Sequence, residues 1–374
     1  MAQAAVAGKG LEGVTATTSA VSSIIGSTLT YRGIDINELA ERSTFEEVAY
    51  LLWYGELPNG QELEKFRNAL SQNRELKPEV LELLSRFPHD ANSMVSLRTA
   101  VSAMAFFDEA ASDMSPEANN AKAIRLLAKF PSVVAAILRF REGKEPLAPD
   151  PDLNEASNFL YMLTGRRPSD LSAHIMDVAL VLHADHELNA STFAARVAAS
   201  TLSDMHSAVV AAICTLKGPL HGGANEAVMK TLESIGSPDK VQRYVQAALD
   251  RKERIMGFGH RVYKEGDPRA HWLRRMSEQL SAESGNDKWY EISRRMEDAV
   301  KADKGLLPNV DFYSASVYTY LGVPRDLFTP IFAVSRVSGW IAHILEQYSD
   351  NRLIRPRAEY VGPSQRHYVP IQER

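Results

Sequence analysis

The chain has 374 residues, which is long enough to bury a large core and to form two domains. Apolar residues make up 45% of it and charged residues 24%, with a net charge of −5. This composition is ordinary for a globular protein and argues against a chain that binds nucleic acid or a membrane surface as a whole. A local basic pocket for an anionic ligand remains compatible with it.

The single cysteine, Cys214, excludes an intrachain disulfide and fits a reducing cytosol. Its apolar neighbours predict a buried small residue and not a nucleophile. We find no apolar run of transmembrane length, and residues 1–10 lack the long apolar core of a signal peptide. A cytoplasmic protein is therefore expected.

Strand signals are few and lie near the start of the chain. The segments 14–18 and 27–33 are rich in threonine and other strand-forming residues and could pair with each other. A capping box at 43–46 predicts a helix that runs through Trp53 and ends at the Pro-Asn-Gly of 58–60. Further helices are predicted at 61–71, 78–86, 93–111, 120–141, 153–163, 169–183, 191–216, 225–235, 239–252, 270–283, 289–302, 310–321 and 326–348.

These elements define an all-α class with minor N-terminal strands, which disfavours a dinucleotide-binding or P-loop enzyme. The glycines after Leu220 lack the preceding strand that a dinucleotide site requires. Charge is denser between 238 and 304 than elsewhere. We interpret that stretch as the body of a smaller domain inserted into a larger, more apolar one.

Residues 183–187, HADHE, place His183 and His186 three positions apart on one helical face. Together with Asp185 they could ligate a divalent metal and serve a metal-dependent hydrolase. They could also be the polar end of a helix, or supply one histidine to an anion site. The absence of HExxH spacing makes the metal the weakest of the three interpretations.

His221 lies in the segment 218–226, GPLHGGANE, just before a predicted helix. A ring near a helix N-terminus tends to stay neutral, and a neutral imidazole can donate a hydrogen bond to a developing enolate oxygen. The alternative is a histidine that only caps the turn.

His260 lies in the segment 257–263, GFGHRVY, and Lys264, Asp267 and Arg269 follow it closely. Such clustered charge suggests an anionic ligand with phosphate or carboxylate groups. A solvated run of charges is commoner in general, but the glycines on either side of Phe258 make it less fitting here.

Asp311 follows Pro308 and Asn309, so Asn309 is a candidate N-cap and Asp311 falls in the first helical turn. An aspartate in a first turn is usually structural. Phe312 and Tyr313 could, however, supply a drier setting in which a carboxylate is a stronger base.

Three arginines near the C-terminus are candidate anion ligands. Arg336 lies inside the most apolar helix of the chain, where a charge must be paired or functional. Arg355 and Arg357 flank Pro356 in a stiff segment, and such arginines can clamp carboxylates through two hydrogen bonds.

With these segments in view, the chain resembles the citrate synthase family in its short bacterial and archaeal form. The three histidine and aspartate segments, HADHE and the two arginine segments occur in the family's order and spacing, and the resemblance runs from 10–13 to the 368–370 tail. It implies a nearly all-helical homodimer. The large domain would comprise 1–221 and 317–374, and the small, closing domain 222–316.

The resemblance also implies a reaction, the condensation of acetyl-coenzyme A with oxaloacetate and hydrolysis of the citryl thioester. Asp311 would take the methyl proton, His221 would stabilise the enol, and His260 would act at the oxaloacetate carbonyl. The family needs no metal or other cofactor, since acetyl-coenzyme A is a substrate. The implied oxaloacetate ligands are His186, Arg269, Arg336 and, from the partner subunit, Arg355, and the implied coenzyme A contacts are Met256, Gly257, Phe258, Gly259, Arg261 and Lys264.

Elementary chemistry agrees with this assignment. A thioester α-carbon is a very weak acid, so a lone carboxylate needs a preorganised donor at the enol oxygen. The chain begins almost directly at residues 10–13, so the NADH regulation of longer relatives is not expected. The main alternative is 2-methylcitrate synthase, which uses propionyl-coenzyme A, since one methylene gives only about 1–3 kcal/mol of discrimination. A helical scaffold would leave His221, His260 and Arg336 without a role.

Overall fold

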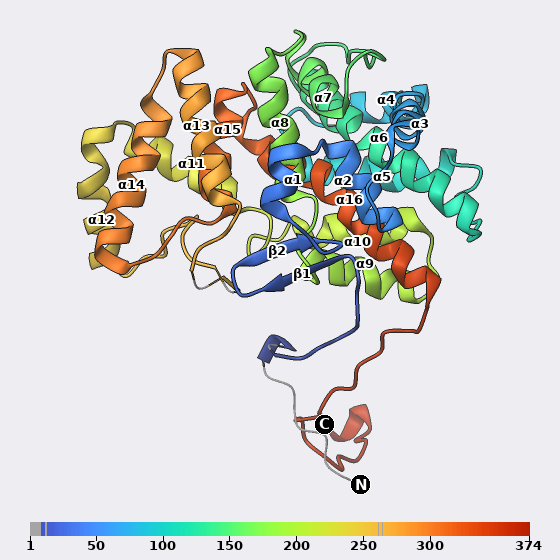
Figure 1. Cartoon of the computed structure of the whole chain (residues 1–374). Coiled ribbons are helices and arrows are strands. Elements are labelled where there is room, and N and C mark those ends of the chain that lie inside the picture. Colours follow the sequence, from blue (N-terminus) through green and yellow to red (C-terminus); the bar gives the residue numbers. More distant parts are fainter. Residues whose placement is uncertain (1–8, 12, 261, 264) are drawn as a thin grey trace.

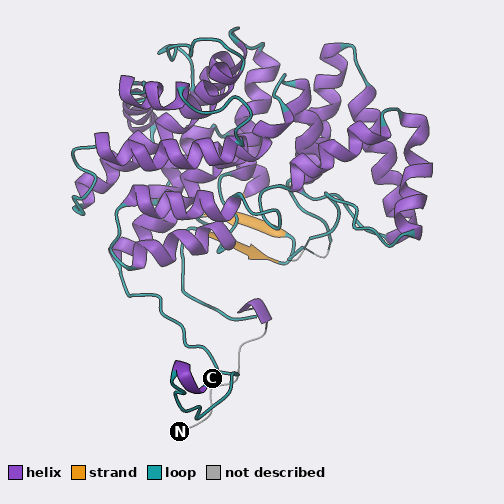
Figure 2. Cartoon of the chain, turned by 180° about the vertical axis from the view of Figure 1, so that it is seen from behind, coloured by secondary structure: helices purple, strands orange, loops and turns teal. Residues whose placement is uncertain are grey.

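The structure is a computed structural model that describes residues 9–11, 13–260, 262–263 and 265–374. The expected mainly α class is confirmed, with helices throughout and one small sheet (Figures 1 and 2). The α-helices are α1 (Ile36–Arg42), α2 (Phe45–Tyr54), α3 (Gly60–Ser71), α4 (Pro78–Ser85), α5 (Ser93–Met104), α6 (Pro116–Arg141), α7 (Glu155–Thr164), α8 (Asp170–His183), α9 (Ala190–Ser200), α10 (Met205–Leu216), α11 (Ala224–Ile235), α12 (Val241–Asp250), α13 (Ala270–Ser284), α14 (Lys288–Lys304), α15 (Val310–Tyr320) and α16 (Phe328–Ser349). The 3₁₀ helices are η1 (Lys9–Leu11), η2 (Ala105–Phe107), η3 (Pro238–Lys240), η4 (Arg325–Leu327) and η5 (Ile371–Glu373).

The sheet is antiparallel, with strand order β1 (Ser22–Ile25), β2 (Thr28–Tyr31), β3 (Ile34–Asp35). The predicted strand at 27–33 is confirmed in its centre, but the one at 14–18 is wrong. β2 pairs with β1 through the tight turn at Gly26, which has a φ of +62°. The β-branched residues of 14–18 favour extended backbone, yet they are mostly exposed and have no partner strand.

Several predicted helix ends move by a few residues. The capping box belongs to Thr44 and Glu47, one position later than predicted, and α2 ends at Gly55 with a left-handed φ of +92°. The Pro-Asn-Gly at 58–60 does not end α2. Asn59 instead caps α3, and its side chain accepts from the backbone N–H of Gln61 and Glu62.

The predicted helix at 191–216 is two helices, α9 and α10, because Asp204 caps a new helix and accepts from the backbone N–H of Ser207. The predicted helix at 93–111 ends at Met104, and α1 was not predicted at all. Cys214 is exposed, so its predicted burial is wrong. Ala212 and Ile213 occupy the inward positions of α10, and the helical period turns Cys214 outward.

α16 forms the centre of the larger part of the molecule. Its residues from Phe328 to Ile344 are buried, and it packs against α2, α6, α8, α9 and α10. The stretch Arg325–Ser349 is long and apolar enough to cross a membrane by composition, contrary to our expectation that no run would be. Its apolar window is wholly buried inside the structure, as expected for the central helix of a folded core.

Helices α11 to α15 lie together on one side of the molecule, coloured yellow to orange-red in Figure 1. Within this group α13 packs on α15 and α12 on α14. The grouping resembles the predicted small domain 222–316, whose boundaries stay a prediction. The C-terminal segment after α16 leaves the body on the same side as the described residues that precede β1 (Figures 1 and 2).

Candidate active site

His221 lies in the turn between α10 and α11, where the peptide N–H of Gly222 donates to Leu216 O at 2.9 Å. A side chain at Gly222 would collide with the backbone and side chain of Leu216, so the turn requires glycine. The His221 ring faces the first turn of α9. Its Nε2 lies 3.3 Å from the backbone nitrogen of Ser191 and 2.8 Å from Ser191 Oγ.

The backbone N–H of Ser191 can only donate, so Nε2 of His221 accepts and the ring proton lies on Nδ1. Burial, and after it the charge of Arg336, lowers the pKa of His221 to about 4. A neutral imidazole was predicted from the N-terminus of the following helix, α11, but burial and the charge of Arg336 are what lower the pKa, and the ring contacts the first turn of α9. Trp340 fixes the same serine through a bond from Nε1 to Ser191 Oγ of 3.1 Å.

Two backbone segments far apart in sequence bring His260 and Asp311 into one site. Phe258 forms a bridge with Pro308, Gly259 N–H donates to Leu307 O at 2.9 Å, and Asn309 N–H donates to Gly257 O at 2.9 Å. Gly257 has a φ of +84° and lies against the ring of Phe312, where a Cβ would be 2.8 Å from Cδ2. The glycines around Phe258 are thus needed for this pairing.

The ring of His260 is oriented by its own loop. Nδ1 accepts from the backbone N–H of Val262 at 3.1 Å and of Tyr263 at 3.2 Å. Nε2 therefore carries the proton of the neutral ring and is the atom that can donate to a ligand. Burial lowers the pKa of His260, which favours this neutral form.

His186 and His260 lie side by side, with ring centroids 5.3 Å apart. Tyr263 contacts both: its hydroxyl is 3.0 Å from Nε2 of His186, and its ring centroid is 4.5 Å from that of His260. Burial and the nearby charges of Arg269 and Arg336 place the pKa of His186 well below its usual value. Both imidazoles are therefore neutral beside two guanidinium groups.

Asp311 occupies the first turn of α15, as predicted, and its backbone N–H donates to the N-cap side chain of Asn309 at 3.0 Å. Burial raises the pKa of Asp311 to about 6, although the charges of Arg269 and Arg336 oppose the shift. A carboxylate that is poorly solvated and still ionised at neutral pH is a stronger base than an exposed one.

Arg269 is buried and forms a bidentate ion pair with Asp267, with distances of 2.9 Å from Nε to Oδ1 and 2.8 Å from Nη2 to Oδ2. Oδ2 of Asp267 also accepts from the backbone N–H of Val310 at 3.0 Å. One carboxylate therefore orients the arginine and fixes the start of α15, the helix that carries Asp311.

Arg336 is only 1% exposed, and it forms no ion pair within the part of the chain that the structure describes. Nε donates to His183 O at 2.7 Å, and the guanidinium lies 4.6 Å from the ring of Phe332. Burial lowers the pKa of Arg336 to about 10, so it remains charged at neutral pH. A buried cation of this kind needs an anion, from the protein or from a ligand.

A cavity of about 750 Å³ connects the catalytic candidates. His221, His260 and Asp311 all line it, and so do the four described coenzyme A candidates of the 256–259 loop. Arg261 and Lys264 lie outside the described residues. Arg355 is exposed on the segment that leaves the body after α16, so it does not join the other predicted residues within this chain.

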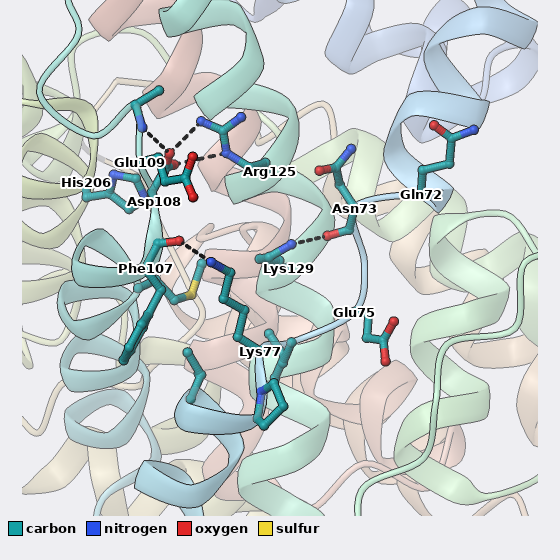
Figure 3. A pocket seen from close by; sticks show the side chains of 15 residues that line it. Gln72, Asn73, Glu75, Lys77, Phe107, Asp108, Glu109, Arg125, Lys129 and His206 are labelled. Carbon is teal, nitrogen blue, oxygen red and sulfur yellow. Dashed lines mark hydrogen bonds and ion pairs between the residues drawn. The ribbon is translucent and has the colours of Figure 1, made fainter.

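A second cavity, of about 690 Å³, lies elsewhere and holds none of the predicted residues (Figure 3). Its cations already have partners: Arg125 binds both carboxylate oxygens of Asp108, Lys129 donates to Asn73 O at 2.5 Å, and Lys77 donates to Phe107 O at 2.6 Å. We therefore assign the chemistry to the first cavity, where a carboxylate and two imidazoles meet.

The contacts of residues 183–187 do not support a metal site in this segment. His183 donates from Nδ1 to Ala179 O at 2.7 Å, Asp185 turns toward His343, and His186 turns toward Tyr263. Within the described part of the chain no three His, Cys, Asp or Glu side chains are arranged to hold a metal ion. The geometry favours the anion-binding interpretation of His186.

Four residues of this site had no predicted role: Ser191, Tyr263, Asp267 and Trp340. Asp267 had a weak signal, because it stands two residues before Arg269 in a Pro-containing turn. Ser191 and Trp340 act through contacts across the fold that no local pattern reveals.

Two imidazoles and a carboxylate line one cavity, and the buried guanidinium groups of Arg269 and Arg336 act on that carboxylate. This is the equipment of an enzyme that moves protons on an anionic substrate. Residues 10–357 match the family described as "Citrate synthase, C-terminal domain". The chain is 56% identical to "Citrate synthase 2" of Bacillus subtilis over 98% of this chain and 99% of that protein. It is 46% identical to "2-methylcitrate synthase" of Shewanella oneidensis over 98% of both chains.

A solved structure gives the same result in three dimensions. The structure described as the ternary complex of carboxymethyl coenzyme A and oxaloacetate with citrate synthase from Thermoplasma acidophilum matches with a TM-score of 0.91 and 37% identity, over 98% of this chain and 99% of that one. The chain belongs to the citrate synthase family and is an acyltransferase. The hydrolase and scaffold alternatives are therefore wrong.

Proposed function

We propose that this protein condenses acetyl-coenzyme A with oxaloacetate and water to give citrate and free coenzyme A. The observation that carries the proposal is the shared cavity of His221, His260 and Asp311 in a chain of this family. The buried guanidinium groups of Arg269 and Arg336 supply the positive charge that a dicarboxylate substrate requires.

Asp311 takes a proton from the methyl group of the acetyl thioester. His221 donates its Nδ1 proton as a hydrogen bond to the thioester oxygen, because its Nε2 is engaged by the N–H of Ser191. The enol that forms attacks the carbonyl carbon of oxaloacetate. Fixed donors at developing negative charge are typically the largest contribution to this kind of catalysis.

His260 presents Nε2–H to the oxaloacetate carbonyl oxygen, which gains a proton as the carbon–carbon bond forms. Water then cleaves the citryl thioester and releases coenzyme A. His186, Arg269 and Arg336 bind oxaloacetate, and the 256–259 loop receives coenzyme A together with Arg261 and Lys264. No cofactor or metal takes part in these steps.

The small domain 222–316 closes over the substrates and shields the thioester intermediate from early hydrolysis. The protein works as a homodimer in which Arg355 reaches the site of the partner subunit. The exposed position of Arg355 on a segment that leaves the body supports this assignment. A cytoplasmic location is proposed because the chain has one cysteine and therefore no intrachain disulfide.

A thiol-release assay tests the function directly. Release of free coenzyme A that depends on oxaloacetate, persists with a chelator and favours acetyl- over propionyl-coenzyme A is expected. Comparable or faster release from propionyl-coenzyme A would instead assign 2-methylcitrate synthesis, an activity named for relatives with 44–46% identity. No release from either thioester would contradict the proposal.

The pH dependence should report Asp311. Its carboxylate is the active form, so kcat/KM for acetyl-coenzyme A should fall about tenfold per pH unit below the pKa of about 6. His221, with a pKa of about 4, stays neutral through this range and adds no second limb there. Rates between pH 4.5 and 8 at saturating oxaloacetate check this. A profile that is flat down to pH 5 would exclude Asp311 as the titrating base.

A further inference from the structure

The loop that carries His186 is held in an unusual backbone conformation. Glu187, the next residue, has a φ of +52°, a region that residues other than glycine seldom adopt. Such a conformation persists only where the surrounding contacts determine it. The contacts that do so here lie on both sides of His186.

Ser22 of β1 binds the residues before and after His186. Its hydroxyl donates to Oδ2 of Asp185, and its Oγ accepts from the backbone N–H of Glu187 at 2.9 Å. Tyr31 of β2 fixes the backbone of Asp185, since its hydroxyl accepts from Asp185 N–H at 3.1 Å and donates to Asp185 O at 2.9 Å. The small sheet thus holds the loop from one side.

The carboxylate of Asp185 is held from the other side by α16. Nε2 of His343 lies 3.3 Å from Oδ2 of Asp185, and Nδ1 of His343 accepts from Nη1 of Arg196 at 3.1 Å. Because the guanidinium can only donate, the proton of the neutral His343 ring lies on Nε2, where it faces Asp185. His343 and Asp185 are fully buried, so water cannot replace either partner.

The contacts of His343 continue through Arg196 to the C-terminal part of α16. Arg196 also binds Glu346 at 2.5 Å and Gln347 at 3.2 Å, and Glu346 accepts from the backbone N–H of Ala20 at 2.7 Å. Burial alone would raise the pKa of Asp185, but His343, Arg336 and Ser22 together lower it, so the carboxylate is ionised. Gly339 of α16 leaves no room for a side chain beside it.

We propose that Ser22, Asp185 and His343 are positioning residues for the oxaloacetate site, forming a clamp that presents His186 to the substrate. The clamp acts through backbone and ring orientation and none of its three members is assigned to the reacting atoms. The inference rests on the proposed function, because it takes oxaloacetate as the ligand of His186.

The test compares Ser22→Ala, His343→Leu and His343→Gln with the wild type, in the full-length protein. Ser22→Ala and His343→Leu should raise KM for oxaloacetate about tenfold, the range in which supporting hydrogen bonds act. Their KM for acetyl-coenzyme A should stay within about twofold of the wild type. His343→Gln should restore the KM for oxaloacetate to within about threefold, because the amide can still donate to Asp185 and accept from Arg196.

Ser132→Ala is the matched control, since Ser132 is also buried and donates to a carbonyl, that of Arg74, at 2.7 Å. It should leave both KM values unchanged. Unchanged KM for oxaloacetate in Ser22→Ala with a lowered melting temperature, or a glutamine variant as impaired as the leucine one, would overturn the clamp. If His343→Leu fails to fold, Ser22→Ala decides.

Calorimetric titration of the wild type with oxaloacetate separates the two possible failures. Absence of binding to the wild type would contradict the proposed function. Binding to the wild type that Ser22→Ala does not weaken would contradict the clamp alone.

Discussion

Asp311→Asn should lower kcat by about 1,000-fold, within the range found for removal of a general base, while oxaloacetate still binds. Asparagine has nearly the same shape but cannot accept the methyl proton. The N-cap contact of the backbone N–H with Asn309 does not involve the side chain and should persist. Steady-state turnover with acetyl-coenzyme A and calorimetric titration with oxaloacetate measure the two properties.

The same substitution should also change the stability of the protein, and in the direction opposite to its effect on turnover. Burial raises the pKa of Asp311 from the usual 3.8 to about 6. The stabilising contribution of a raised carboxyl pKa is present below the unfolded value and is lost as the pH rises through about 6. At pH 8 the wild type therefore carries an unfavourable ionised carboxylate that the variant lacks.

Asp311→Asn should accordingly melt at the same or a higher temperature than the wild type at pH 8, and this difference should disappear near pH 4. Asp303→Asn, an exposed aspartate of α14, is the matched control and should change neither turnover nor melting temperature. Turnover of Asp311→Asn within tenfold of the wild type would remove Asp311 from the role of base.

The helical class could be predicted because apolar periodicity and capping residues mark most of the helices in the sequence. α15 is the clearest example, since Asn309 caps it as the sequence indicated. Predictions failed where tertiary contacts decide the outcome. Residues 14–18 have good strand propensity but no partner, and the break between α9 and α10 depends on a left-handed Leu202 that an apolar pattern does not reveal.

In the candidate site too, some residues could be predicted from local sequence and others could not. The sequence singled out His221, His260 and Asp311 from their local surroundings, and the structure places all three around one cavity. What orients them is not local: Ser191 reaches His221 from a different helix, and the 307–309 segment pairs with the 257–259 loop. Supporting contacts between distant segments leave no spacing pattern in a single sequence.

The second large effect is expected from substitution of Arg355. This residue is exposed, so it can bind oxaloacetate as proposed only if it reaches the site of a partner subunit. Arg355→Gln should raise KM for oxaloacetate about 100-fold, the scale expected when one partner of a desolvated charge pair is removed. Arg357→Gln, two residues further on and also exposed, is the matched control. It should leave KM for oxaloacetate within about threefold of the wild type.

Mixing the Asp311→Asn and Arg355→Gln variants, both impaired at low oxaloacetate concentration, distinguishes an arginine that acts across the interface from one that acts within its own subunit. A dimer of one Asp311→Asn subunit and one Arg355→Gln subunit contains one site with the native aspartate and, from its partner, the native arginine. Its other site lacks both. Random pairing should therefore restore about a quarter of the wild-type rate at low oxaloacetate concentration. If Arg355 acts within its own subunit, every site in the mixture lacks one of the two groups and no activity returns.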